Sequence, residues 1–166
     1  MDTLDILKLR RSVRVFQDKD IPKKVLEDLI EVARFSPTAR NVQPWEFIVI
    51  TVAQTLKKIG ELAENARFMA SAKACIAIFC SATKYYLEDG CSATVNILNA
   101  ATALGIGSCW VAGDKKPYCK EVTGLLGISP GLKLVSLIAL GYPEDQNCFK
   151  FADKRSLKEV LHWEKF

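Results

Sequence analysis

The chain has 166 residues, of which 49% are hydrophobic and 25% are charged, and its formal net charge at pH 7 is +4. This length and composition predict a single globular domain over residues 1–166 with a sizeable core, and they exclude an intrinsically disordered chain. The charge is too small for the concentrated basic stripe of a nucleic-acid-binding protein, so we expect no nucleic-acid partner.

The first half of the chain alternates between helical and extended patterns. A short helix is expected at residues 4–9, with Asp2 or Thr3 as its cap. Pro22 favours the first position of a second helix, whose apolar residues recur on one face as far as residue 34. This helix ends where Ser36 precedes a proline. The β-branched run 47–51 indicates a strand that is buried on both faces.

The second half of the chain continues the alternation. Helices are expected at residues 56–63, 93–104 and 118–126, and strands at 74–80, 109–111 and 134–140, with a connection at 82–90. The 93–104 helix carries small residues on nearly all of its faces, which favours close packing at the centre of the molecule or at a subunit interface. Gly105 ends this helix. The tail to Phe166 ends in large apolar rings and is expected to dock on another surface.

The cysteines and the termini limit the classes of protein that remain. Six cysteines show no CxxC pair and no disulfide-dense pattern, and His162 is the one histidine. These counts favour free thiols over a zinc or iron–sulfur site, so we expect no metal and a reducing, cytoplasmic compartment. The acidic N-terminal residues do not form a signal peptide, and the longest apolar stretch, 132–140, is too short to span a bilayer. We therefore expect no membrane partner.

The stretch 36–45, SPTARNVQPW, has neither a helical nor a strand period. Two prolines stiffen a backbone that carries Thr38, Arg40, Asn41 and Gln43 between an expected helix and an expected strand. One interpretation is a rigid loop whose polar side chains hold a polar ligand. The other is a proline-punctuated turn whose polar residues face solvent. The spacing alone leaves both interpretations open.

A cluster of arginines lies near the N-terminus, where residues 10–16 read RRSVRVF. The simpler interpretation is that Arg10 and Arg11 complement the dipole at the end of the first helix, which leaves Arg14 unexplained. Together with Lys154 and Arg155 near the other end of the chain, these cations could converge on one small anion.

Taken together, RRSVRVF and SPTARNVQPWEF resemble the FMN-dependent nitroreductase family of NAD(P)H flavin oxidoreductases. The glycine-rich segment 105–113, the strand and turn 140–143, and the basic pair 154–155 followed by 160–163 are similar to further family segments in the same order. The resemblance implies an α+β fold with a mixed central sheet flanked by helices. It also implies an intertwined homodimer, in which the C-terminal extension reaches across to the partner, and FMN as cofactor with NADH or NADPH as reductant.

FMN requires cations for its phosphate, donors and acceptors for its pyrimidine edge, and a positive charge near N1 and O2 to favour its reduced form. By resemblance, Arg10 and Ser12 contact the ribityl chain and phosphate, with Arg11 beside them. Arg14 lies near the N1–O2 edge, and Asn65 is similar to the family's flavin-edge asparagine. The remaining implied contacts are Pro37, Thr38, Ala39, Asn41 and Gln43 from the other subunit, Ala112 and Gly113 near the reactive edge, and Lys154 and Arg155 at the phosphate.

The activity implied by the resemblance is hydride transfer from NAD(P)H through flavin N5 to an electron-poor acceptor, such as a nitroaromatic or a quinone, in a ping-pong cycle. No catalytic side chain is expected beyond Arg14 as a tuner of the flavin, because the cofactor carries the chemistry. Ala112 stands where some relatives carry an acidic residue, and the absence of long insertions predicts an open flavin face. An FMN-storage protein with little turnover is the alternative. Dehalogenation or flavin breakdown is a third interpretation, disfavoured because no lid segment is found.

Overall fold

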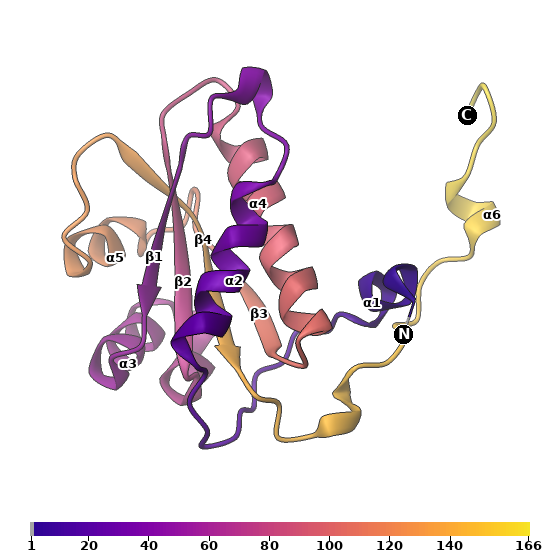
Figure 1. The fold of residues 1–166 in the computed structure, drawn as a ribbon. Helices are drawn as coiled ribbons and strands as arrows, with labels where there is room; N and C mark the ends of the chain where they lie inside the picture. The colour runs from indigo at the N-terminus through magenta and orange to yellow at the C-terminus, as the bar shows by residue number, and fades with distance from the viewer. Residues whose placement is uncertain (1) are drawn as a thin grey trace.

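A four-stranded sheet forms the centre of the computed structural model, which describes residues 2–166 (Figure 1). Its strands are β1 (Trp45–Ile50), β2 (Ala74–Ser81), β3 (Gly107–Ala112) and β4 (Leu132–Gly141), in the spatial order β1-β2-β4-β3. The expected α+β class is confirmed. The pairing is antiparallel throughout this sheet rather than mixed, and parallel pairing in residues 2–166 is limited to an isolated bridge between Ser12 and Ser108.

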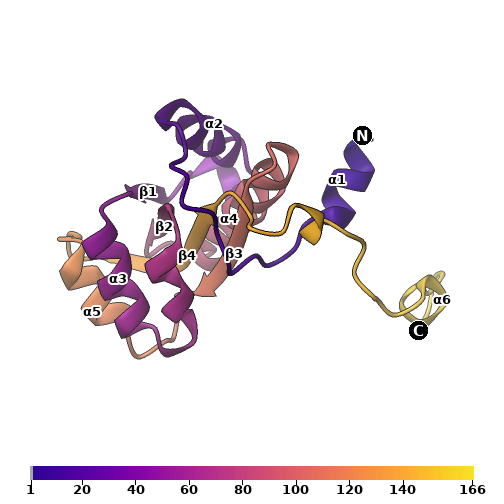
Figure 2. The same ribbon diagram turned by 90° about the horizontal axis from the view of Figure 1, so that it is seen from below.

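Helices cover both faces of the sheet (Figure 2). On one face lie α2 (Lys23–Arg34) and α4 (Tyr86–Ala103), and on the other lie α3 (Ala53–Leu62), the 3-10 turns of η2 (Glu64–Ser71) and α5 (Cys119–Leu125). Cys75 and Phe79 of β2 pack in the core on the α3 side, whereas Ile76 and Ile78 pack in the core below α2 and α4. This two-sided burial explains the uninterrupted apolar run of β2.

The expected helices are confirmed, although several ends shift by a few residues. Pro22 precedes α2 as its N-cap residue rather than occupying its first position. Gly105 ends α4 in the left-handed region, with φ of +69°, as the sequence predicts. Among residues 2–166, no helix is both long and apolar enough to cross a bilayer.

The prediction of burial on both faces is wrong for the strand at 47–51. This strand is β1, which begins at Trp45 and lies at the edge of the sheet, and Val49 is 42% exposed. A β-branched run records a preference for extended, partly packed backbone. It does not record how many strands or helices pack against it, so the pattern could not distinguish an edge strand from a central one.

The expected connection at 82–90 is also wrong in part, because α4 already begins at Tyr86. The sequence pattern did not predict this start, because Gly90 lies in the first turns of α4 and glycine is unfavourable inside a helix. In the fold it allows α4 to approach β4, because a Cβ atom on Gly90 would lie 2.8 Å from Val135 Cγ2. Val135 has no partner on β2, because Ile78 pairs with Ser136 and Phe79 pairs with Leu134. This change of register is a bulge in β4.

Both ends of the chain lie to one side of the sheet (Figures 1 and 2). They comprise α1 (Thr3–Leu9) and a tail that contains η3 (Gln146–Cys148) and α6 (Leu157–Val160), and none of these elements has a buried residue. Trp163 is 80% exposed, so its ring finds little cover within its own chain. Isolated bridges from Ser12 to Ser108 and from Phe16 to Pro143 attach the segment after α1 to the sheet.

Candidate active site

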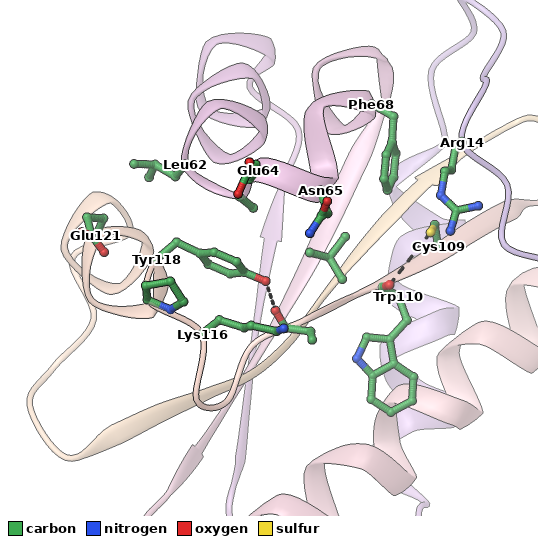
Figure 3. A pocket seen from close by; sticks show the side chains of 14 residues that line it. Arg14, Leu62, Glu64, Asn65, Phe68, Cys109, Trp110, Lys116, Tyr118 and Glu121 are labelled. Carbon is green, nitrogen blue, oxygen red and sulfur yellow. Dashed lines mark hydrogen bonds between the residues drawn. The ribbon is translucent and has the colours of Figure 1, made fainter.

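A cavity of about 550 Å³ opens beside β3, between η2 and the start of α5 (Figure 3). Arg14 reaches it from the segment after α1, and Asn65 and Phe68 point into it from η2. The remaining lining includes Cys109, Trp110, Val111 and Ala112 of β3, Lys116, Pro117, Tyr118 and Glu121 near α5, and Leu62, Ala63 and Glu64 where α3 ends and η2 begins. Aromatic, polar and charged groups therefore converge on one hollow, as expected of a small-molecule site.

The guanidinium of Arg14 occupies one end of this cavity beside the ring of Phe68 (Figure 3). Its carbon Cζ lies 5.6 Å from the centre of that ring, within the range of a cation–π contact. Within residues 2–166, no carboxylate lies within ion-pair distance of Arg14, so its positive charge is available to a ligand.

Side chains at the start of α5 hydrogen-bond back to the backbone at the end of β3 and hold the segment between them. The Tyr118 hydroxyl donates a hydrogen bond to the carbonyl oxygen of Ala112, and the Cys119 thiol donates to that of Gly113 at 2.7 Å. Gly113 also approaches β4 closely, because a Cβ atom there would lie 2.7 Å from the Val135 carbonyl oxygen. The backbone at 112–113 is thus held in place beside the cavity.

Four cations line a second cavity, of about 420 Å³, next to α1. They are Lys8, Arg10, Arg11 and Lys154, and the buried Nη2 atom of Arg11 has no hydrogen-bond partner among residues 2–166. Leaving such a donor unpaired is costly, whereas a phosphate would accept its hydrogen bond and neutralise the local charge. The residues present therefore fit the phosphate of a cofactor such as FMN.

The loop at 36–45 is tied to α4 rather than free in solvent. The buried carboxylate of Asp89 accepts hydrogen bonds from the Thr38 hydroxyl at 2.8 Å and from the Ala39 N–H at 3.1 Å. Further along α4, the Asn96 amide donates to the Ser36 hydroxyl at 2.7 Å. Arg40, Asn41 and Gln43 all have positive φ, a conformation that is uncommon for non-glycine residues, although asparagine adopts it more readily than most.

The first turn of α4 also holds the segment after β3. The Tyr86 hydroxyl donates to Asp114 Oδ1 at 2.7 Å, and this hydrogen bond, more than burial, raises the pKa of Tyr86 to about 12. One turn of helix therefore supports two of the segments that the sequence singles out, one through Asp89 and one through Tyr86.

The structure gathers the sequence-predicted site residues into three places. Arg14, Asn65 and Ala112 line the first cavity, with Gly113 adjacent to it, and Arg10, Arg11 and Lys154 line the second. Ala39 lines a third, small cavity with Asp89, on the loop that also carries Pro37, Thr38, Asn41 and Gln43. Ser12 and Arg155 line none of these: the first bridges to β3, and the second donates to the Glu159 carbonyl at 2.8 Å.

Sequence reasoning missed Asp89, Phe68 and Tyr118. An acidic residue in the first turn of a helix is a recognisable signal. Asp89 was missed because the sequence predicted that this helix begins only at residue 93. Phe68 and Tyr118 carry no local signal, because each gains its position only from the packing of η2 or α5 against the sheet.

All six cysteines are free thiols, as the sequence predicts. Burial raises the pKa of both Cys75 and Cys80 to about 12, and it also raises the pKa of Cys109 in the first cavity. Few of these thiols are therefore in the reactive thiolate form near neutral pH.

Comparison with known proteins assigns the chain to a family. Residues 7–75 match the model of the Nitroreductase family, and residues 51–166 match a model described as "Putative TM nitroreductase". A protein of Archaeoglobus fulgidus named "Putative NADH dehydrogenase/NAD(P)H nitroreductase" is 35% identical over 172 residues, covering 99% of each chain. The chain belongs to the nitroreductase family. The oxidoreductase class expected from the sequence is confirmed with it.

Solved structures agree with this assignment. The crystal structure of a Clostridium acetobutylicum protein described as "Putative NADH Oxidase" has a TM-score of 0.90 and 28% identity, covering 97% of this chain and 99% of that one. A Desulfovibrio desulfuricans protein described as a "putative nitroreductase in complex with fmn" has a TM-score of 0.86 and 24% identity, covering 100% of this chain and 98% of that one. The nitroreductase-like fold is therefore confirmed.

Proposed function

We propose that this chain is an FMN-dependent oxidoreductase that uses NAD(P)H to reduce an electron-poor acceptor, such as a nitroaromatic or a quinone. The observation that carries the proposal is the pair of cavities. One is lined by four cations, of which Arg11 has a buried guanidinium nitrogen without a partner in the described residues, and the other is lined by Arg14, Asn65 and Ala112. When bound, FMN supplies the ability to take a hydride from the nicotinamide and give it to the acceptor.

In this proposal the residues of the protein bind the cofactor and orient it. Arg10, Arg11 and Lys154 hold the phosphate, and Arg14 places a positive charge where the reduced cofactor becomes negative. Asn65 offers an amide to the cofactor edge, and the fixed backbone of Ala112 and Gly113 borders the reacting region. Ser12 and Arg155 add to the phosphate and ribityl contacts, and Pro37, Thr38, Ala39, Asn41 and Gln43 complete the site from a second subunit.

Support for FMN and for NAD(P)H comes from two relatives. The Desulfovibrio desulfuricans protein holds FMN on a fold of the same kind, and the name of the Archaeoglobus fulgidus relative specifies NAD(P)H. Because the nicotinamide and the acceptor react at one open face, each binds after the other has left, which gives a ping-pong cycle. The six free thiols support a cytoplasmic location.

The same proposal includes a homodimer and one FMN-binding domain over residues 1–166. The loop anchored by Asp89 lines a different cavity from the cations, which supports the proposal that the two groups reach one ligand from two copies of the chain. The exposed rings of the tail would gain cover on that partner. Sedimentation of the FMN-loaded protein should give a dimer. A monomer with full FMN occupancy would contradict the shared site.

The test of function is reconstitution with FMN followed by two measurements. The absorption spectrum should show a bound flavin, and NADH or NADPH oxidation should depend on an added acceptor such as menadione. Bound flavin without acceptor-dependent oxidation would favour the storage protein instead. A chain that binds no FMN would contradict both.

A further inference from the structure

We propose that Phe68 is a positioning residue that acts through Arg14 and sets the reduction potential of the bound flavin. This inference rests on the proposed function, because it concerns the charge that Arg14 presents to the cofactor. It adds a residue outside the expected flavin-binding set, and it arises from the contact between the Phe68 ring and the Arg14 guanidinium (Figure 3).

Arg14 has little else to fix its guanidinium. The residue is exposed and follows α1 in a segment without regular structure. Its hydrogen bond to a protein acceptor is a long one, 3.4 Å from Nη1 to the Ser12 carbonyl oxygen. In the described residues it also lacks an ion-pair partner. The 5.6 Å contact with the Phe68 ring is therefore a principal constraint on where this charge lies.

Phe68, by contrast, lies on a firmly packed element. Its ring is half-buried and packs against the core on the α3 side of the sheet. The adjacent residue, Met69, is completely buried, and the Ser71 hydroxyl donates to the Phe68 carbonyl at 2.8 Å. A ring held this way can restrain a flexible arginine, whereas the arginine contributes little to holding the ring.

The position of the charge matters because the flavin gains negative charge near N1 and O2 on reduction. A cation fixed at that edge favours the reduced form over the oxidised form, and a cation that samples many rotamers favours it less. A cation–π contact at a partly exposed site is weak, so losing it changes an equilibrium by only a few-fold. Its loss should lower the preference for reduced over oxidised flavin by about threefold. For a two-electron couple, this corresponds to a midpoint potential about 15 mV more negative.

The test is a double-mutant cycle read out as the midpoint potential of bound FMN. Phe68→Met removes the aromatic face but keeps a similar volume, Phe68→Tyr keeps the face, and Arg14→Gln removes the charge. We expect Phe68→Met to lower the potential, Phe68→Tyr to leave it unchanged and Arg14→Gln to lower it further. In the Arg14→Gln background, Phe68→Met should have no additional effect, because its influence passes through the arginine.

Other results would overturn the inference. An unchanged potential in Phe68→Met, or equal shifts with and without Arg14, would show that the ring does not act through the guanidinium. Phe68→Leu provides a second test if Phe68→Met fails to fold. Failure of the proposed function is recognisable separately, because the unmodified protein would then bind no FMN.

Discussion

Asp89 shows how a single buried carboxylate can define a loop. It accepts two hydrogen bonds from the start of a segment in which Arg40, Asn41 and Gln43 all have positive φ. The left-handed conformation is unfavourable for these side chains, so the loop needs anchors to keep it. The Gln43 N–H donates to the Thr38 hydroxyl at 3.1 Å, which places the same hydroxyl at the centre of the loop's hydrogen bonds.

We expect Asp89→Ala to weaken FMN binding about tenfold, because two hydrogen bonds to a charged acceptor are lost and the loop relaxes. Asp89→Asn is the matched control: its oxygen can accept from the Ala39 N–H, and its amide can donate to the Thr38 hydroxyl. Fluorescence titration with FMN measures both variants, and thermal unfolding checks that they are folded. Equal affinities for the alanine and asparagine variants would argue against this anchoring role.

Arg10 tests the phosphate assignment. Arg10→Ala should weaken FMN binding about tenfold or more, because a charge-assisted hydrogen bond contributes about 1.5–3 kcal/mol. Riboflavin lacks the phosphate and should bind the variant and the unmodified protein almost equally. Lys8→Ala is a suitable control, since Lys8 lines the same cavity but lies 3.6 Å from the carboxylate of Asp5. A matching loss of riboflavin affinity would place Arg10 elsewhere on the flavin.

At the scale of elements, α4 connects the sheet to both loops of the candidate site. Its first turn holds Thr38 through Asp89 and Asp114 through Tyr86, and Gly90 allows that turn to lie against β4. The buried Thr94 hydroxyl lies 2.7 Å from the Ser136 hydroxyl one turn further on, which fixes the helix at the bulge of β4. Packing at this crossing therefore has consequences for the site.

Gly90→Ala should destabilise the fold by about 1–3 kcal/mol, because the new methyl group would overlap a buried valine and lie 3.1 Å from Cys80 Sγ. Gly124→Ala in α5 is the control, because an added Cβ atom there would have no atom within 4 Å among the described residues outside its own helix turn. That change should stabilise the protein by about 0.4–1 kcal/mol through lower entropy of the unfolded chain. Urea unfolding of both variants gives the comparison. A neutral Gly90→Ala would mean that α4 can move away from β4 at little cost.

At the scale of the whole molecule, burial of the thiols links stability to pH. The pKa of Cys75 is raised from 9.0 to about 12 in the folded protein, and that of Cys80 likewise. As pH rises, the unfolded chain loses these protons first, near pH 9, while the folded chain keeps them. The contribution to stability is therefore complete below about pH 8 and is lost progressively between pH 9 and 12.

Thiol labelling should follow the same order. At pH 8 the native protein should react slowly, with Cys75 and Cys80 protected, and the denatured protein should titrate six thiols without any reductant. The free energy of unfolding, measured in urea from pH 7 to 10, should fall at the alkaline end, and Cys75→Ala should reduce that slope. Rapid labelling of all six native thiols would mean that the core opens readily.

Several features were predictable because their causes are local. Apolar periodicity is a property of neighbouring residues, so the main helices and strands were anticipated, as was the stop at Gly105. The arginine cluster and the 36–45 loop were also singled out by their composition and resemblance, and their role as site segments stays a prediction. The edge position of β1 and the early start of α4 were not, because each depends on a contact with residues far away in the sequence.

By itself, the sequence determined the α+β class, the family and the types of side chain that it offers to a ligand, because these reside in composition, periodicity and motif order. The tertiary structure decided the strand order, the holding of the 36–45 loop by Asp89 and the pairing of Phe68 with Arg14. Those features join residues separated by tens of positions along the chain. Their energy comes from burial and hydrogen bonds made only once the sheet and its two helical layers are packed, so local patterns cannot encode them.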